Sequence, residues 1–345
     1  MKEPGMTEPG MSANGTARPL LLPLTPLYRL ALSLREWRLR SGLEAVRCLK
    51  FPVISIGNLS TGGAGKTPFA IALARALVGA GFAVDVLSRG FGRSTRGPAR
   101  VRPEGSAAEF GDEPLLIARE AEVPVYVASQ RFEAGLLAEA SEVIRPRVHL
   151  LDDAFQHRQL HRDIDILLLD RDDWRDRLLP AGNLREPRRA AMRASVIAIP
   201  AGDVEFESAL RSYGWGGPVW RLHRRVEVPA VSGPVLAFCG IARPGQFFAG
   251  LEAAGTRLAG RVAFRDHHDY AARDLNRLQD AARAAGAGAL VTTAKDQVRL
   301  TPLIPSFRLD LPVLTAGLRI EIERESAALD WLTDRLKAIP TRPAL

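Results

Sequence analysis

The chain has 345 residues and a mass of 37.5 kDa, a length that predicts two domains. Its composition, 46% hydrophobic and 25% charged, is ordinary for a soluble globular protein whose core needs no disulfide or structural metal. The two cysteines, Cys48 and Cys239, exclude four-cysteine zinc sites and iron–sulfur clusters and favour a reducing compartment. A net charge of +8, almost all from arginine, favours phosphate-bearing partners such as nucleotides, nucleic acids or anionic lipids, or reflects codon bias alone.

The N-terminal region combines a polar tail with an amphipathic helix. Residues 1–18 are rich in Gly, Pro, Met, Thr and Ser and predict a disordered tail. Residues 26–41 predict a helix with an apolar stripe of Leu27, Leu30, Ala31 and Leu34. Such a basic, aromatic-bearing helix either lies in a membrane surface or packs on its own domain. No cleavable signal peptide and no apolar stretch of about 18 residues is evident, so no transmembrane helix is expected.

A strand–loop–helix–strand pattern begins at residue 51. The apolar run FPVISIG (51–57) predicts a buried strand, and TPFAIALARALVGAG (67–81) predicts a helix that ends on glycine. FAVDVLS (82–88) predicts a second strand, so the three segments form a βαβ unit. Further apolar strands are predicted at 124–127, 148–151, 164–169 and 195–199. Their alternation with helical segments predicts a mainly parallel sheet covered by helices.

The pattern changes after residue 213, which divides the predicted fold into two parts. Residues 214–232 are Gly-rich and then alternate in polarity, which indicates a hairpin or linker. A second α/β pattern follows, with strands at 235–240 and 289–293 and helices at 244–254, 271–285 and about 323–338. We therefore predict a mainly parallel α/β domain over 19–213, a β-hairpin linker over 214–232 and a smaller α/β domain over 233–345.

The segment GNLSTGGAGKT, residues 57–67, lies between a predicted buried strand and a predicted helix and has the features of a phosphate-binding loop. Glycines let backbone N–H groups converge on phosphate oxygens, Lys66 can meet the outer phosphates, and the Thr67 hydroxyl can hold Mg²⁺. The general pattern has glycine at the position of Ser60, so this loop is longer or differently turned. We expect a P-loop NTPase-like domain whose nucleotide-binding residues are Gly57, Asn58, Ser60, Thr61, Gly62, Gly63, Ala64, Gly65, Lys66 and Thr67.

Two adjacent acids complete the predicted nucleotide site. VHLLDD, residues 148–153, is an apolar strand that runs into Asp152 and Asp153, where P-loop proteins need an acid for the Mg²⁺ shell. One of the two could instead cap a helix. None of the four asparagines forms the N-K-x-D pattern that GTPases usually carry, which points towards ATP.

Five further clusters carry residues that could bind or deprotonate a phosphate acceptor. They are SRGFGR (88–93), GDEP (111–114), FQH (155–157), LPAGNLREP (179–187) and FRDHHDY (264–270). Their acids and histidines are candidate bases, and their arginines supply positive charge for phosphate. Taken singly, each cluster is more simply explained by helix capping or surface charge.

Taken together and in this order, these motifs resemble the tetraacyldisaccharide 4′-kinases, the lipid A 4′-kinases of Gram-negative bacteria. The resemblance runs from about residue 20 to 335, and the family's own loop accounts for Ser60. It implies transfer of phosphate from ATP, with Mg²⁺, to the 4′-hydroxyl of a tetraacylated glucosamine disaccharide 1-phosphate, which gives lipid IVA. It also implies two α/β domains joined by a β-hairpin, with the site in the cleft between them.

The resemblance implies a role for each site residue as well. Asp112 would act as the catalytic base, paired with His267 from the second domain, and His268 stays open as the alternative histidine. Lys66 and Arg185 would stabilise the transferred phosphate. The implied metal-side residues are Thr67, Asp152, Asp153 and Glu186. The residues predicted to line the rest of the site are Arg89, Glu113, Gln156, His157 and His268.

A substrate with four acyl chains stays in the bilayer, so the implied enzyme is peripheral on the cytoplasmic face of the inner membrane. This location favours the interfacial interpretation of helix 26–41. Neither a nucleic acid nor an obligate protein partner is expected. Two rival hypotheses stay open: a P-loop kinase for a soluble small acceptor, and a P-loop switch ATPase that transfers no phosphate to a sugar.

Overall fold

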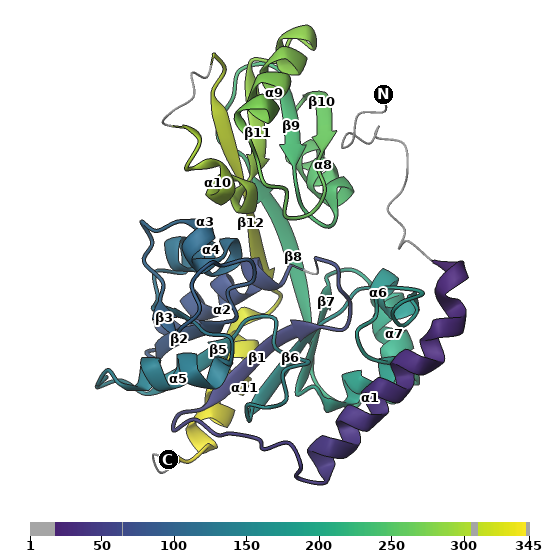
Figure 1. Ribbon diagram of the computed structural model, residues 1–345, viewed down its shortest axis with the longest axis vertical. Helices are drawn as coiled ribbons and strands as arrows, with labels where there is room; N and C mark the ends of the chain where they lie inside the picture. The colour runs from purple at the N-terminus through teal and green to yellow at the C-terminus, as the bar shows by residue number, and fades with distance from the viewer. Residues whose placement is uncertain (1–17, 64, 305–309, 343–345) are drawn as a thin grey trace.

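The computed structural model describes residues 18–63, 65–304 and 310–342 and has an α/β fold built around one large sheet (Figure 1). Within the described residues the sheet has twelve strands in the order β10-β9-β11-β12-β8-β7-β6-β1-β5-β2-β4-β3. Among these strands only the pairs β3–β4 and β8–β12 are antiparallel, so the predicted mainly parallel sheet is confirmed. Residues 1–17 of the predicted disordered tail lie outside the described residues.

Strands and helices alternate along most of the chain. The strands are β1 (Val53–Asn58), β2 (Ala83–Ser88), β3 (Ala99–Arg100), β4 (Val125–Val127), β5 (Arg147–Leu151), β6 (Ile164–Leu168), β7 (Val196–Pro200), β8 (Val219–Glu227), β9 (Val235–Cys239), β10 (Leu258–Ala263), β11 (Ala289–Thr293) and β12 (Val313–Ile322). The α-helices are α1 (Thr25–Arg40), α2 (Lys66–Gly79), α3 (Ala107–Phe110), α4 (Asp112–Ala121), α5 (Arg131–Glu139), α6 (Arg171–Arg175), α7 (Val204–Ser212), α8 (Pro244–Ala253), α9 (Ala272–Ala284), α10 (Ala294–Leu300) and α11 (Glu325–Ala338). The 3₁₀ helices whose bounds the structure describes are η1 (Pro19–Leu24) and η2 (Arg188–Arg193).

The part of the sheet from β7 to β3 is covered on both faces. Successive residues of a strand point to opposite faces, so Ile54 and Ile56 of β1 pack with α2, α4 and α11, whereas Val53 packs on the α5 side. On that second face, Leu167 of β6 and Ile197 of β7 contact a cluster that includes residues of α6 and α7. Burial on both faces is typical of parallel strands and explains why these strands are continuous apolar runs in the sequence.

The strands β10, β9, β11 and the first residues of β12 form a second, smaller parallel arrangement. On one face, residues of α9 pack with Leu236, Phe238 and Leu290. On the other face, residues of α8 pack with Val235 and Ala237. This part lies above the first in Figure 1.

The connection between the two parts differs from the predicted hairpin. β8 pairs in parallel with β7 through residues 219–222 and antiparallel with β12 through residues 222–227. β12 pairs with β11 through residues 313–316 before it joins β8. Residues 214–232 therefore contribute one strand of the two-stranded connection, and its partner comes from a distant segment. The alternating sequence predicts a strand but does not say which strand it pairs with.

The last helix returns to the first part of the fold. Leu332 and Leu336 of α11 belong to the same hydrophobic cluster as β1 and α2. The rings of Trp331 and Trp220 meet edge to face at 5.9 Å between centroids. The division into two domains stays a prediction, and α11 packs with the first part although its residues fall in the predicted second domain, 233–345.

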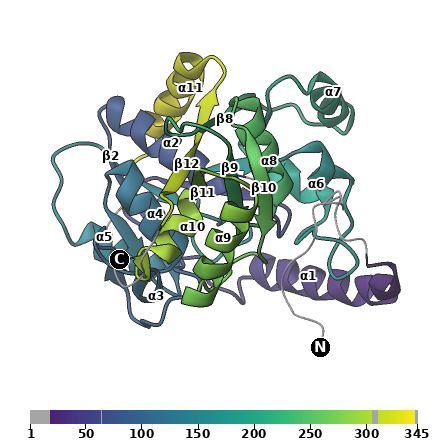
Figure 2. The same ribbon diagram turned by 90° about the horizontal axis from the view of Figure 1, so that it is seen from above.

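The helix α1 lies along one side of the molecule, apart from the sheet (Figure 2). Its predicted apolar stripe is exposed: Leu27, Leu30 and Leu34 keep 55–67% of their accessible surface. The opposite side of the helix makes the contacts with the rest of the chain, where Tyr28 and Leu32 pack against the cluster around Phe155. The stripe therefore does not pack on its own domain within the described residues. None of the described helices is long and apolar enough to cross a membrane.

A buried histidine joins two strands and a helix in the first part. Nδ1 of His149 lies 3.4 Å from Oδ2 of Asp85, and its Nε2 lies 3.2 Å from Oε1 of Glu139. Burial disfavours a charged imidazole, but the hydrogen bonds and charges of the two carboxylates outweigh it and raise the pKa of His149. Protonated His149 therefore contributes to stability.

We expect His149→Gln to lower the free energy of unfolding by about 3 kcal/mol at mildly acidic pH, because it breaks a buried charged pair. Since the pKa is raised by folding, this contribution is complete below the unfolded pKa of about 6.5 and is lost as pH rises through the folded pKa. Urea denaturation of both proteins across this range should show the difference shrinking with rising pH. A difference independent of pH would contradict a charged His149, and His223→Gln, at a half-exposed histidine, is the control.

Candidate active site

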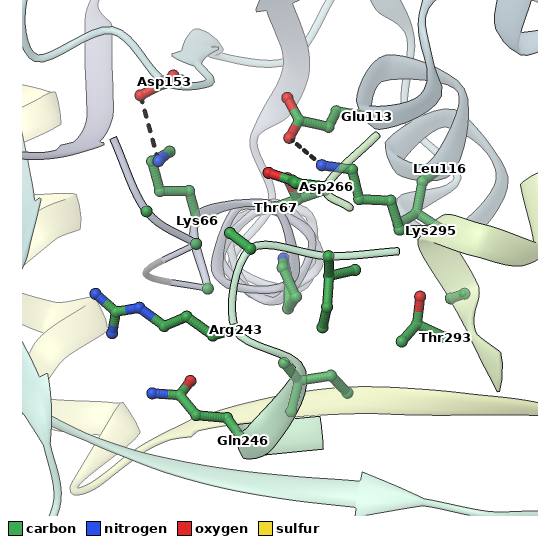
Figure 3. Close-up of a pocket in the computed structure, with 18 of the residues that line it drawn as sticks. Lys66, Thr67, Glu113, Leu116, Asp153, Arg243, Gln246, Asp266, Thr293 and Lys295 are labelled. Atoms are coloured by element: carbon green, nitrogen blue, oxygen red, sulfur yellow. Dashed lines mark hydrogen bonds and ion pairs between the residues drawn. The ribbon is translucent and has the colours of Figure 1, made fainter. Parts of the chain in front are cut away.

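A cleft of about 1300 Å³ lies between the two parts of the fold (Figure 3). One wall is formed by the loop between β1 and α2 and by the segments that follow β2 and β5. The other wall is formed by residues of β8, α8, α10 and β12. The first wall is the edge where parallel strands end, which is where α/β sheets place their ligands.

The loop of residues 57–67 connects β1 to α2 and presents its second half to the cleft. Gly65 has a φ of +80°, a left-handed conformation that glycine adopts without strain, and it immediately precedes α2. The N–H groups and the positive end of the helix dipole at this position favour a phosphate. The described loop residues that line the cleft are Thr61, Gly62, Gly63, Gly65, Lys66 and Thr67. Ala64, predicted to belong to this set, lies outside the described residues.

Three other residues predicted to bind nucleotide, Gly57, Asn58 and Ser60, lie buried behind the loop. Asn58 Nδ2 donates to Ser60 Oγ at 2.9 Å and to the Gly62 carbonyl at 3.1 Å. Asn58 Oδ1 accepts a hydrogen bond from Lys66 Nζ at 2.9 Å. A Cβ on Gly57 would lie 2.6 Å from Cβ of Phe155. The segments that contain Gly57 and Phe155 can therefore approach this closely only because residue 57 is glycine. These residues support the loop from behind.

Asp153 lies opposite the loop lysine, after β5. Lys66 Nζ is 3.5 Å from Asp153 Oδ1 (Figure 3), and Arg185 Nη1 donates to both carboxylate oxygens at 3.0 Å. Burial raises the pKa of Asp153, but these two cations outweigh it and lower the pKa below its usual range. Arg131 Nη2 donates to the carbonyls of Asp152 and Asp153 and so fixes the turn that presents both acids.

Asp152 lies beside Asp153 at the end of β5 and is buried. Burial and the negative charges of Glu113 and Asp153 raise its pKa above the usual range. Within the described part of the chain, its buried Oδ1 has no hydrogen-bond partner. A buried, unpartnered carboxylate oxygen beside a second acid fits a divalent cation, which prefers such oxygens. Among the described residues, however, no group of three or more His, Cys, Asp and Glu is close enough to form a complete metal site.

Asp112 and His267 meet across the cleft. Asp112 begins α4, and its Oδ2 lies 3.2 Å from Nδ1 of His267, which comes from the second part of the fold. Arg299 of α10 donates to the same oxygen through Nε at 2.9 Å and also through Nη2. Burial raises the pKa of Asp112, but the bond to His267 and the cations of α10 outweigh it and hold the pKa well below its usual range. The carboxylate is therefore ionised in this arrangement.

Lys295, the second cation of α10, contacts both His267 and Glu113, the acid that follows Asp112. Lys295 Nζ lies 3.0 Å from Glu113 Oε1 (Figure 3) and 3.2 Å from Nε2 of His267. Burial lowers the pKa of Lys295, but the charges of Glu113 and Asp112 outweigh it and raise the pKa. The two cations of α10 thus flank the imidazole, since Arg299 Nη2 lies 3.2 Å from its Nδ1.

Of the five residues predicted to line the site, Arg89, Glu113, Gln156 and His157 line the cleft, whereas His268 is not among the described residues that do. Gln156 also accepts from Arg185 Nη1 at 3.3 Å. Burial and the nearby charge of Arg131 lower the pKa of His157 to about 3, so this imidazole is uncharged at neutral pH. Helix α1 contacts the same segments, because Tyr28 donates to the Arg185 carbonyl at 2.8 Å and Arg35 donates to the Gln156 carbonyl.

Two predicted residues point elsewhere. Glu186 was expected on the metal side, but its carboxylate pairs with Arg193 at 2.8 Å, and it is not among the described residues that line the cleft. Arg185 therefore faces Asp153, whereas Glu186 faces Arg193. His268 bonds Asp274 at 3.1 Å and stacks on Phe264, so of the two neighbouring histidines His267 is the one that faces Asp112.

Several residues in or beside the cleft were not predicted from the sequence. Lys295 and Arg299 follow the predicted strand 289–293, and a charged segment at the end of a buried strand was a usable signal. Arg131 and Arg243 gave no such signal, because each reaches its partners only through the packing of distant segments.

Comparison with known proteins gives consistent results. The sequence matches the family described as tetraacyldisaccharide-1-P 4′-kinase over residues 17–337. It is 40% identical over 319 residues to a tetraacyldisaccharide 4′-kinase of Koribacter versatilis, covering 89% of this chain and 96% of the relative. It is 41% identical over 313 residues to that of Geobacter metallireducens, covering 83% and 89%.

A solved structure is also similar. The crystal structure of LpxK from Aquifex aeolicus in complex with ATP superimposes with a TM-score of 0.73 at 34% sequence identity. The match covers 92% of this chain and 99% of that one. The large, mostly parallel sheet is therefore shared with a protein crystallised with a nucleotide.

Proposed function

The chain belongs to the tetraacyldisaccharide 4′-kinase family of lipid A biosynthesis, and on this premise we propose that its cleft transfers the γ-phosphate of ATP to the 4′-hydroxyl of a tetraacyldisaccharide 1-phosphate, giving lipid IVA. The observation that carries this proposal is the meeting of Asp112 and His267 in a cleft that also contains the phosphate-binding loop. Phosphoryl transfer requires a base for the acceptor and positive charge for the phosphate, and both are available there.

The loop and its cations are the proposed phosphate site. Backbone N–H groups of the described loop residues 61–63 and 65 and of the start of α2 would hold the phosphates of ATP. Lys66 and Arg185 would stabilise the negative charge on the transferred phosphate, since both already lie against Asp153. The loop residues behind them keep Lys66 directed into the cleft through Asn58.

Asp112 and His267 are the proposed acid–base pair. A sugar hydroxyl is a poor nucleophile, so its proton must leave as it attacks. Asp112 is ionised and its Oδ2 lies 3.2 Å from Nδ1 of His267, so the pair can share a proton taken from the hydroxyl. Because the two residues come from different parts of the fold, their contact depends on how those parts meet.

Mg²⁺ is the proposed cofactor, held by Asp152 and Asp153 with the hydroxyl of Thr67. The unpartnered, buried Oδ1 of Asp152 supports this assignment, and the pairing of Glu186 with Arg193 weakens the case for Glu186. When bound, the ion neutralises charge on the phosphate oxygens. Asp153 keeps Lys66 and Arg185 beside the ion's proposed position.

We propose that the molecule consists of two domains, as predicted, which move relative to one another during the reaction. The first would comprise residues 19–213 together with α11, the second the arrangement around β9 to β11, and β8 with β12 would join them. A two-stranded connection of this kind can bend, and bending would alter the distance between Asp112 and His267.

Membrane attachment through α1 is the proposed route to the acylated substrate, at the cytoplasmic face of the inner membrane. The exposed leucines at positions 27, 30 and 34, with Trp37, form an apolar face with arginines beside it, the composition of an interfacial helix. Because the inner side of α1 touches the carbonyls of Arg185 and Gln156, the attached helix would bring the cleft to the bilayer surface.

The purified protein in detergent micelles should add one phosphate to a tetraacyldisaccharide 1-phosphate when Mg²⁺-ATP is supplied, as measured by mass spectrometry of the lipid. Fragmentation should locate the new phosphate at the 4′ position, and omission of ATP is the control. Consumption of ATP without a phosphorylated lipid would contradict the proposal and support a switch ATPase. Phosphorylation of a soluble sugar in preference to the lipid would support the other rival.

A further inference from the structure

Arg299 of α10 connects the segment that follows β11 to the start of α4. Its Nε donates to Oδ2 of Asp112 at 2.9 Å, and its Nη2 donates to the same oxygen. Both side chains are buried, with 9% of Arg299 and 7% of Asp112 exposed. Nη2 also lies 3.2 Å from Nδ1 of His267. One guanidinium therefore contacts both members of the proposed acid–base pair.

A second buried carboxylate holds this guanidinium from within the second part of the fold. Asp296 precedes Arg299 by three residues in α10, so the two side chains are neighbours on the helix, and Nη1 of Arg299 donates to Asp296 Oδ1 at 3.2 Å. The hydroxyl of Tyr270 donates to the same Oδ1 at 3.0 Å, and that of Thr293 donates to Oδ2 at 2.6 Å. Asp296 has no exposed surface. It is therefore fixed by its donors, and it restricts Arg299 in turn.

The backbone at Gly240 links Arg299 to the histidine. The Gly240 carbonyl accepts from Nη1 of Arg299 at 3.0 Å and from the backbone N–H of His267 at 3.2 Å. The N–H of Gly240 donates to Oδ1 of Asp296 at 3.1 Å. The residues that bring the imidazole and the guanidinium to Asp112 are thus all bonded to one residue of the second part, which sets their relative position.

We propose that Arg299 is a positioning residue that holds the Asp112 carboxylate in the orientation at which it meets His267. The inference rests on the proposed acid–base role of Asp112. From its own helix the carboxylate receives a bond at Oδ1, from the backbone N–H of Glu113 at 3.0 Å. Without Arg299, Oδ2 would lose two donors and the carboxylate could turn away from the imidazole. Misplacement of a catalytic group by about 1 Å can cost about a hundredfold in rate.

The charge of Arg299 has the opposite effect on the reaction from its position. Among the described residues, the charged or titratable side chains that contact the Asp112 carboxylate are His267, Lys295 and Arg299. Glu113, the next acid in α4, pairs with Lys295 (Figure 3). Burial raises the pKa of Asp112, and His267, Lys295 and Arg299 lower it. Loss of the Arg299 cation would therefore raise the pKa of Asp112 and make its carboxylate a stronger base.

The two effects can be separated at a pH where Asp112 is ionised in wild type and variant alike. If Arg299 acted by its charge alone, its removal would leave kcat there unchanged or raise it, because the base becomes stronger. A fall in kcat at that pH measures the loss of position.

The test measures kcat for lipid phosphorylation as a function of pH, at saturating Mg²⁺-ATP and lipid. Above the acid limb of the profile, we expect Arg299→Gln to lower kcat about tenfold, with the KM for ATP within about twofold. Its acid limb should move to higher pH. Arg299→Lys should leave the acid limb near its wild-type position but keep a lowered kcat, because an ammonium retains the charge without the fork of a guanidinium. Arg283→Gln, at an exposed arginine of α9, is the matched control and should behave as wild type.

A double variant distinguishes positioning of Asp112 from a general structural role. In the Asp112→Asn background, Arg299→Gln should lower kcat by less than about twofold further, since the carboxylate that it positions is already gone. Equal fold losses in the two backgrounds would overturn the inference. It would also be overturned by an unchanged kcat of Arg299→Gln above the acid limb, or by full recovery of kcat in Arg299→Lys.

Melting temperatures near the wild-type value establish that the variants are folded. If Arg299→Gln is destabilised, because Asp112 and Asp296 both lose their cation, Arg299→Lys carries the same comparison in both backgrounds. Failure of Asp112→Asn itself to lower kcat would instead contradict the proposed base.

Discussion

Replacing Asp112 with asparagine is expected to lower kcat by about 10²–10⁴ and to leave the KM for ATP little changed, because a positioned general base contributes that much to the rate. Asparagine keeps the size of the side chain and an oxygen for the backbone N–H of Glu113, but it cannot take a proton. Arg299 would keep its bonds to Asp296 and the Gly240 carbonyl, so α10 stays anchored. Initial rates of lipid phosphorylation at saturating ATP and lipid measure the effect.

The matched control is Asp280→Asn, the same change at an aspartate of α9 whose side chain is exposed. It should behave as wild type. If Asp112→Asn changed only a KM, Asp112 would be a binding residue, and the pairing with His267 would serve to hold the two parts of the fold together. Loss of activity together with a large fall in melting temperature would point to the same structural role.

Replacing Lys66 with alanine is expected to lower kcat/KM for ATP by at least about 10²–10³, the effect of losing one group that stabilises transition-state charge. The change removes the cation 3.5 Å from Asp153 and the donor to Asn58. Arg185 still neutralises Asp153, so the protein should remain folded. Mass spectrometry of the lipid product under excess ATP, with long reaction times, measures the residual rate.

Lys337→Ala in the last turn of α11, at an exposed lysine, controls for the loss of one positive charge. It should retain full activity. Lys66→Arg should restore little, because a planar guanidinium does not replace a compact ammonium at this position. More than a tenth of wild-type activity in Lys66→Ala would exclude the loop lysine from the proposed transfer step.

The features that could be predicted from the sequence are those encoded by neighbouring residues. A buried strand, a glycine-rich loop and a helix follow one another within about thirty residues, so the loop between β1 and α2 was predictable from periodicity and glycine alone. Asp152 and Asp153 end an apolar strand, and parallel strands end at one edge, which predicts that they lie near the loop. The amphipathic pattern of α1 was equally local, although its contacts were not.

The features that only the tertiary structure decided depend on which distant segments pack together. Pairing of β8 with β12, the return of α11 to the first part, and the approach of Lys295 and Arg299 to Asp112 each join residues far apart in the chain. The sequence left His267 and His268 open as alternatives, and the structure distinguishes them because their imidazoles meet different partners. The sequence-based prediction misplaced Glu186, because the direction of a side chain in a loop is set by packing. Local spacing specifies elements and motifs, whereas contacts across the cleft arise only when both parts of the fold are in place.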